Sequence, residues 1–307
     1  MSELKGKRGN IVPEEKDTIA IIGLGRVGTA MGILLQAAGY PVTAVSSRSA
    51  PPAGAAVEPA GALFHENPAD AAAQARCVLI TTSDDAIAPV CERIARSGTV
   101  GPGKKVVHMS GAGGLDLLAT ASRKGAFVAC IHPIQAFANA KSALSSIPGS
   151  TFGITADEAI RDWAVGLVRD IGGVPFFVPG NRKALYHAAA CIASNYLVTL
   201  LYVVSKIGEA FGLAERETLD AYGPLVRGTI RNIEEHGTIS ALTGPIARGD
   251  GGTVARHFEA FKESLPRYLD AYRALGEITV DMAVEKKTVA PEKAETIRSI
   301  LKGGKQS

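Results

Sequence analysis

The stretch Thr18-Ile19-Ala20-Ile21-Ile22-Gly23-Leu24-Gly25-Arg26-Val27-Gly28-Thr29-Ala30 decides the fold of this chain. An apolar run typical of a β-strand breaks into Gly-x-Gly-x-x-Gly and continues as a helical pattern, and a second apolar run at 41–45 completes a β-α-β unit. Gly23 permits a tight turn, Gly25 lets backbone approach a pyrophosphate, and Gly28 lets the helix pack on the strand. The stretch predicts dinucleotide binding at the helix N-terminus. The alternative is a helix start whose glycines serve packing alone.

The composition is that of an ordinary globular protein. The 307 residues suffice for two domains and a large core, with 46% hydrophobic and 21% charged residues. Lys and Arg number 33 against 30 Asp and Glu, a net charge of +3. This balance, without a basic cluster interleaved with aromatic residues, argues against nucleic acid as a partner.

The cysteines and the N-terminus point to a cytoplasmic protein. Cys77, Cys91, Cys130 and Cys191 show no zinc-like spacing, so we expect no metal site and a reducing compartment. Residues 1–17 are charged and lack an apolar signal-peptide core, and we expect them to form a disordered tail. The apolar segment 188–204 contains Ser194 and Asn195; we interpret it as a buried helix rather than a membrane span.

The second strand ends at Ser46-Ser47-Arg48, where an NAD-preferring fold usually places an acidic residue. Two hydroxyl groups and a guanidinium instead suit a 2′-phosphate. This favours NADP(H); the alternative is a polar loop with a solvated arginine.

Strand and helix patterns alternate up to about residue 180, which predicts an α/β fold with a mostly parallel, doubly wound Rossmann sheet of eight strands. Strand signals then stop. We therefore expect a dinucleotide-binding domain at 18–180 and an all-helical domain at 181–302, the latter serving substrate binding and dimerisation. The expected helices are 182–211, 215–235, 253–264, 267–275 and 291–301.

The candidate catalytic residues lie at the start of the helical part. Lys183 and His187 are four residues apart and share a helix face, which Asn195 continues. Lys183 could polarise or protonate an acceptor oxygen, and His187 could be the acid or fix the lysine, so the proton donor stays open between them. Asn195 could hydrogen-bond a substrate carbonyl or carboxylate. The alternatives are a solvated lysine, a structural histidine, and an asparagine that bridges helices or subunits.

Strand ends and one loop supply the remaining candidates. The predicted cofactor-binding residues are Gly23, Leu24, Gly25, Arg26, Val27, Gly28, Ser46, Ser47, Arg48, Thr82, Ser83 and Ser110. His132 is a substrate-binding candidate, although a histidine before a proline can merely shape a turn. Arg248, in the Gly-rich segment 243–253, is a candidate anion clamp; the alternative is a capped connection between helices.

Several motifs together resemble the Rossmann-like proteins with a C-terminal DUF2520 domain, over about residues 17–301. They are the glycine motif, Thr82-Ser83-Asp84-Asp85, His108-Met109-Ser110-Gly111, His132-Pro133-Ile134-Gln135-Ala136-Phe137, Tyr186-His187-Ala188-Ala189-Ala190 through Ser194-Asn195-Tyr196, and Gly244-Pro245-Ile246-Ala247-Arg248-Gly249-Asp250. The resemblance implies an oxidoreductase that uses NADP or F420, with an unassigned substrate.

The layout is also distantly similar to pyrroline-5-carboxylate reductase, ketopantoate reductase and the β-hydroxyacid dehydrogenases. The latter two carry a catalytic Lys-x-x-x-Asn; Lys183 matches its lysine, but His187 stands at the second position. The resemblance implies hydride transfer to a small carbonyl or imine, such as a 2-keto acid or a cyclic imine acid. An F420-dependent enzyme and a non-catalytic dinucleotide-binding regulator or scaffold stay open. We expect a homodimer through the helical domain and no membrane partner.

Overall fold

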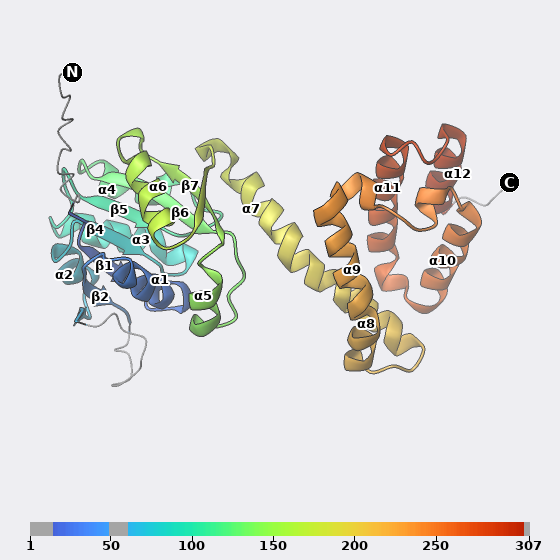
Figure 1. The fold of residues 1–307 in the computed structure, drawn as a ribbon, viewed down its shortest axis with the longest axis horizontal. Coiled ribbons are helices and arrows are strands. Elements are labelled where there is room, and N and C mark those ends of the chain that lie inside the picture. Colours follow the sequence, from blue (N-terminus) through green and yellow to red (C-terminus); the bar gives the residue numbers. More distant parts are fainter. Residues whose placement is uncertain (1–14, 49–60, 304–307) are drawn as a thin grey trace, which may run out of the picture. The chain divides into compact units, whose positions relative to one another are not determined.

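The computed structural model describes residues 15–48 and 61–303, which form two compact units divided between Ser194 and Asn195 (Figure 1). The first unit has the expected α/β architecture and the second is helical. The expected domain boundary was residue 180, but the division falls later, because Lys183 and Tyr186 tie the next helix to the sheet through the side-chain contacts described below. The Pro-, Ala- and Gly-rich stretch 50–62 is expected from its composition to be a surface connection. Most of it, and most of the expected N-terminal tail, lie outside the described residues.

The first unit is built on one sheet of eight strands. They are β1 (Ile19–Ile22), β2 (Val42–Ser46), β3 (Leu63–His65), β4 (Cys77–Ile80), β5 (Lys105–His108), β6 (Phe127–Pro133), β7 (Thr151–Ala156) and β8 (Val174–Phe177). Their order is β3-β2-β1-β4-β5-β6-β7-β8, and each neighbouring pair is parallel except β6 and β7. The mostly parallel sheet is thus confirmed. The chain order reverses between β1 and β4, where ligands bind in folds of this kind.

Helices cover both faces of the sheet. They are α1 (Arg26–Ala37), α2 (Pro68–Ala73), α3 (Asp84–Arg96), α4 (Ala119–Ser122), α5 (Ala140–Ser146) and α6 (Arg161–Asp170). One apolar cluster joins the sheet to α1, α5 and α6 and includes Met31 and Leu167. The other joins it to α2, α3 and α4 and includes Ile87 and Ile94. Burial of both faces explains why the central strands are continuously apolar.

The last residues of the expected N-terminal tail are held by the fold. Lys16 donates a hydrogen bond to the carboxylate of Asp170 at 2.8 Å. Asp17 is 7% exposed and accepts a hydrogen bond from Lys105 at 2.6 Å. The expected disorder therefore does not extend to these two residues, since partners distant in the sequence fix them.

A continuous helix joins the two units. It comprises α7 (Lys183–Cys191), a π-helical turn (Ile192–Tyr196) and α8 (Leu197–Ala210). The expectation of a buried helix is wrong for the single chain: Leu185 is 67% and Val198 is 68% exposed. By length and composition alone, Gly180–Ala210 could cross a membrane, and it is the one such helix within the described residues. The same apolar surface is what an interface between subunits requires.

The remaining helices pack around a separate apolar core. They are α9 (Glu215–Ala241), α10 (Gly251–Ser264), α11 (Leu269–Glu285) and α12 (Pro291–Leu301). Val254, Val280 and Ile297 are almost fully buried among α10, α11 and α12. Gly237 has a φ of +76°, which kinks α9 near its end. The predicted helix at 267–275 is longer than expected, because α11 continues to Glu285.

Candidate active site

The three glycines of the first turn have distinct surroundings. Gly23 has a φ of +108°, and a Cβ there would lie 2.9 Å from the backbone of Thr81. A Cβ on Gly28 would lie 1.9 Å from the carbonyl oxygen of Gly23, so α1 packs on the turn as closely as the motif requires. A Cβ on Gly25 would have no atom within 4 Å. Gly25 therefore faces open space at the N-terminus of α1, where a phosphate group can approach the backbone.

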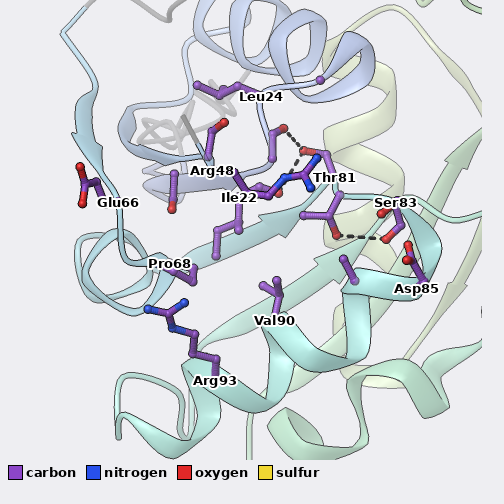
Figure 2. A pocket seen from close by; sticks show the side chains of 16 residues that line it. Ile22, Leu24, Arg48, Glu66, Pro68, Thr81, Ser83, Asp85, Val90 and Arg93 are labelled. Carbon is purple, nitrogen blue, oxygen red and sulfur yellow. Dashed lines mark hydrogen bonds between the residues drawn. The ribbon is translucent and has the colours of Figure 1, made fainter. Parts of the chain in front are cut away.

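A cavity of about 520 Å³ opens beside this turn (Figure 2). Its lining residues come from the ends of β1, β2, β3 and β4 and from α3: Ile22, Gly23, Leu24, Gly25, Ser46, Ser47, Arg48, Glu66, Pro68, Thr81, Thr82, Ser83, Asp85, Ala86, Val90 and Arg93. Eight predicted cofactor residues are among them: Gly23, Leu24, Gly25, Ser46, Ser47, Arg48, Thr82 and Ser83. The cavity has the position and the lining that a dinucleotide at a topological switch point needs.

The cavity also contains charged residues that the sequence motifs did not single out. Arg93 lies on α3, one turn beyond Val90, and Figure 2 shows its side chain extending toward Pro68. Glu66 follows β3 and lines the same cavity as Arg48. The cavity thus offers two guanidinium groups to an anionic ligand, together with one carboxylate at the end of β3. No local sequence signal connects Arg93 with Arg48, because only the sheet topology brings the two residues to the same cavity.

Three further residues hold the glycine turn. Thr81, which the sequence analysis missed, donates a hydrogen bond from Oγ1 to the carbonyl of Gly23 at 2.6 Å. Arg26 was predicted to bind the cofactor, but its guanidinium donates to the carbonyl of Phe137 at 2.6 Å and so ties the turn to the segment after β6. Val27 packs against the apolar cluster of α1. Arg26, Val27 and Gly28 therefore support the turn and do not line the cavity.

The segment after β5 forms a second polar region at the same edge of the sheet. His108 is fully buried; its Nδ1 accepts a hydrogen bond from the Ser110 N–H at 3.1 Å, and its Nε2–H donates to the Gly114 carbonyl at 3.0 Å. Ser110 is buried as well, and its hydroxyl oxygen accepts from the Gly113 N–H at 2.9 Å. Burial lowers the pKa of His108 to about 4, which keeps its ring neutral. Both polar side chains thus shape the loop.

Lys183 begins α7 beneath this loop. Its side chain is 3% exposed. Its ammonium group donates to the carbonyl of Ser110 at 3.2 Å and to Sγ of Cys130 at 3.1 Å. Within the described residues, no carboxylate lies in ion-pair distance of this ammonium group. The structure therefore brings Lys183 to the site as a buried cation that contacts the loop after β5 and the middle of β6.

His132 and His187 meet at Gly111. Their ring centroids are 6.3 Å apart. A Cβ on Gly111 would lie 2.6 Å from His187 and 2.8 Å from His132, so both rings rest against bare backbone. His187 also approaches Sγ of Cys191 at 3.9 Å. Two residues predicted from separate parts of the sequence, His132 and His187, are thus adjacent in the structure.

Tyr186 completes the group and was not among the predicted site residues. Its phenol oxygen lies 2.7 Å from Nδ1 of His132, and its ring lies 5.1 Å from the Lys183 ammonium group. Burial raises the pKa of Tyr186 to about 12. Burial, with the nearby charge of Lys183, lowers the pKa of His132 to about 4. Both groups are neutral at pH 7 and joined by one hydrogen bond.

The other predicted residues lie in the second unit. Asn195 is exposed in the π-helical turn, and its carbonyl accepts a hydrogen bond from Thr199 at 3.1 Å. Arg248 is exposed in a short 3-10 helix (Ile246–Arg248) that precedes α10. Asp250 caps α10 by accepting from the Thr253 N–H at 2.9 Å. The capping alternative therefore describes Asp250, and the roles of Asn195 and Arg248 stay predictions.

The four cysteines are free thiols, and the described residues contain no group of three or more metal-binding side chains. Cys77, Cys91 and Cys130 are buried, and burial raises the pKa of Cys130. Cys130 donates from Sγ to the carbonyl of Ser110 at 3.1 Å. Cys130 therefore belongs to the same group of contacts as Ser110 and Lys183.

Comparison with known families agrees with this two-part architecture. Residues 6–133 match the Rossmann-like domain, and residues 150–279 match DUF2520, a domain of unknown function. The chain therefore combines a Rossmann-like domain with a DUF2520 domain, and the resemblance seen in the motifs is confirmed. Among curated proteins, none matches the chain.

Solved structures share the fold at low sequence identity. A protein from Bacteroides fragilis is 17% identical with a TM-score of 0.65, over 93% of this chain and 99% of its own. Protein TM1727 from Thermotoga maritima is 24% identical with a TM-score of 0.59, over 93% and 99%. A pyrroline carboxylate reductase from Plasmodium falciparum, solved with NADP bound, is 11% identical with a TM-score of 0.56, over 93% and 98%. At these identities the likeness establishes the fold.

Proposed function

We propose that this protein is an NADPH-dependent oxidoreductase that reduces a small carbonyl or imine compound, a 2-keto acid or a cyclic imine acid. The observation that carries the proposal is the cavity beside the glycine turn, whose lining includes Ser46, Ser47 and Arg48 and also Arg93. Hydroxyl and guanidinium groups at this point suit a 2′-phosphate. The Plasmodium falciparum structure, with NADP bound, is consistent with the same use of the fold.

The polar group at the ends of β5 and β6 supports a reductase rather than a passive binding protein. A nicotinamide cofactor supplies the hydride, and the protein must orient the acceptor and deliver a proton. The predicted catalytic residues Lys183 and His187 lie in the first unit with His132, next to the loop that contains Ser110. A buried cation without a carboxylate partner is costly for a fold to keep, which favours a role in chemistry. We retain Asn195 and Arg248 as substrate-binding candidates.

Two further features belong to the proposal. The exposed apolar side chains of α7 and α8 support a homodimer through this helix, because burial by a second copy would remove them from water. The free cysteines and the composition support a cytoplasmic location.

A thermal-shift titration with NADPH, NADH and F420 tests the cofactor. We expect the largest stabilisation with NADPH, since binding to the native state alone raises the melting temperature. Preference for NADH, preference for F420, or no shift with any of the three would each contradict the proposal. Oxidation of NADPH in the presence of 2-keto acids and cyclic imine acids then tests the substrate class. NADPH binding without turnover of any compound would favour the regulatory alternative.

A further inference from the structure

We propose that Tyr186 is the proton donor of the reductase, and that His132 positions its phenol and restores its proton. This inference rests on the proposed function and gives a role to Tyr186, which the sequence motifs include without assigning it one. It starts from the hydrogen bond between the Tyr186 phenol oxygen and Nδ1 of His132, which is 2.7 Å long. The two residues come from α7 and β6 and meet at the carboxyl end of β6.

The structure clears space for this phenol. His132 on β6 is paired with Gly153 on β7. A Cβ on Gly153 would lie 2.5 Å from the phenol oxygen of Tyr186, which is too close for a side chain at position 153. Gly111 leaves room for the other edge of the His132 ring, because a Cβ on Gly111 would lie 2.8 Å from Nε2 of His132. Glycine at both positions lets Tyr186 and His132 occupy this edge of the sheet together.

One tautomer of His132 leaves the phenol proton of Tyr186 available to a substrate. A neutral imidazole carries one proton, on either Nδ1 or Nε2. With the proton on Nδ1, His132 donates to the phenol oxygen of Tyr186, and the O–H of Tyr186 is free to donate to a substrate. The ring of His132 is neutral at pH 7, as this arrangement requires. The Lys183 ammonium, 5.1 Å from the Tyr186 ring, stabilises the negative charge that the phenol oxygen acquires on donation.

Lys183 and His187, two of the other titratable side chains of α7, are less suited to donate. The Lys183 ammonium group is buried and already donates to Ser110 and Cys130. His187 contacts Sγ of Cys191 at 3.9 Å and, within the described residues, has no hydrogen bond that would hold its ring in one orientation toward a substrate. Tyr186 is half-buried, and its phenol is held by the contact with His132. These contacts make Lys183 a positioning and electrostatic residue.

The reduction adds one hydride and one proton to the substrate. A hydride, carrying two electrons, passes from the reduced nicotinamide to the carbon of the C=O or C=N bond. The π electrons of that bond move to oxygen or nitrogen, which takes the proton of the Tyr186 phenol. The resulting phenolate takes the Nδ1 proton of His132, while Nε2 takes a proton from solvent, which gives the Nε2–H tautomer. Exchange with solvent, in which Nδ1 gains a proton and Nε2 loses one, restores the Nδ1–H form. The net change is one hydride from the reduced nicotinamide and one proton from solvent, both carried by the alcohol or amine product.

The first experiment needs no substrate. We place 3,5-difluorotyrosine at position 186, whose phenol ionises at lower pH, and follow its pKa by fluorine NMR. Oxidised nicotinamide is a cation, so we expect a lower pKa of this phenol in the NADP⁺ complex than in the NADPH complex. The groups that face the phenol, namely His132, Lys183, Cys130 and His187, are the same in both complexes. Equal values in the two complexes overturn the role of Tyr186.

The second experiment uses turnover. Tyr186→Phe should lower kcat by about 100-fold or more at unchanged NADPH affinity, the usual range for loss of a general acid. His132→Asn, which keeps an N–H near Nδ1, should retain more activity than His132→Leu. Tyr222→Phe, on α9, serves as the control of unchanged activity. Full activity of Tyr186→Phe contradicts the inference, whereas failure of the wild-type chain to bind NADPH contradicts the proposed function instead.

Discussion

The ammonium group of Lys183 lies 3.1 Å from Sγ of Cys130, and the lysine side chain is 3% exposed. A solvated lysine at the start of α7 was one interpretation of the sequence, and the structure rules it out. The lysine enters the fold between the ends of β5 and β6, where it meets a carbonyl and a thiol. Lys183 can therefore affect both the free energy of unfolding and the rate of catalysis. Substitution of this residue can measure the two effects separately.

Lys183→Met should stabilise the fold while lowering turnover. Methionine is a similar unbranched side chain, and it removes the cost of burying a charge that has only neutral partners. We expect the free energy of unfolding to rise by about 1 kcal/mol. The catalytic rate should fall, because the phenolate of Tyr186 loses a nearby cation. Urea unfolding and NADPH oxidation measure the two effects.

Lys141→Met is the matched control, since Lys141 is exposed on α5. The free energy of unfolding and the catalytic rate of this variant should both stay near the wild-type values. A loss of stability of more than 1 kcal/mol in Lys183→Met would contradict the prediction and would show that the lysine mainly anchors α7. Unchanged turnover would remove Lys183 from the mechanism.

Two glycine substitutions should separate folding from cofactor binding. In Gly28→Ala, the new methyl group would lie 1.9 Å from the Gly23 carbonyl, so the turn must shift and the melting temperature should fall by several degrees. In Gly25→Ala, the methyl group meets nothing within 4 Å, so the melting temperature should stay within about 2 °C.

The same Gly25 methyl group points into the space where a pyrophosphate would approach the helix N-terminus. NADPH affinity should therefore fall by about 10-fold or more in Gly25→Ala despite its intact fold. Fluorescence titration of NADPH checks this result. Normal NADPH affinity in Gly25→Ala would argue that the glycine motif serves packing alone.

Much of the first unit could be predicted from the sequence, because local patterns encode it. All eight expected strands are present, since parallel strands buried on both faces are short continuous apolar runs. The helix expected to end at Leu275 continues to Glu285 instead. Gly276 lies inside this helix, where a Cβ would lie 2.8 Å from Leu301, so this glycine serves close packing of α11 on α12.

The site was only partly predictable for a related reason. Arg48, Ser46 and the glycines follow from a motif with fixed spacing. Tyr186 does not, because its relation to His132 depends on the register in which β6 pairs with Gly153 of β7. Arg93 likewise reaches the cavity only through the packing of α3 on the sheet. Contacts set by long-range pairing leave no periodic signal in the sequence.

Arg48→Ala should weaken NADPH binding by about 10- to 100-fold and change NADH affinity much less. A charge-assisted hydrogen bond to a phosphate accounts for a loss of this size, and NADH lacks the 2′-phosphate. Arg93→Ala should also weaken NADPH binding selectively, by about 3- to 10-fold, because its guanidinium lines the same cavity. Isothermal titration calorimetry with both cofactors measures the selectivity.

Arg96→Ala is the control for these variants, because Arg96 lies on the same helix, is exposed and pairs with Glu92. It should bind both cofactors like the wild type. Equal losses for NADPH and NADH in Arg48→Ala would mean that this arginine contacts the adenine or the shared phosphates and does not select the 2′-phosphate.

Val198→Asp should convert the expected homodimer to a monomer. Val198 is 68% exposed in α8, and a carboxylate would be buried without a partner in an apolar interface between two copies. Light scattering coupled to gel filtration measures the mass. Thr296→Asp, at an exposed position of α12, adds the same charge and should leave the dimer intact. A wild-type monomer would refute the proposed dimer outright.

The stability of the chain should fall as the pH is lowered from 6.5 to 4. Burial lowers the pKa of both His108 and His132 from 6.5 to about 4. Between these values the unfolded chain binds more protons than the folded chain, so stability is complete above pH 6.5 and is lost toward pH 4. At about 1.4 kcal/mol per pKa unit, His108 alone accounts for roughly 3 kcal/mol across this window.

Urea unfolding midpoints between pH 4 and 7 measure the slope of the free energy of unfolding against pH. His108→Gln removes one titrating group, so the slope should become shallower even though the variant is less stable at pH 7, where it loses the hydrogen bonds to Ser110 and Gly114. His236→Gln, at an exposed histidine, should keep the wild-type slope. An unchanged slope in His108→Gln would show that His108 is not held neutral in the native state, because only a group whose protonation differs between the folded and unfolded chains contributes to the slope.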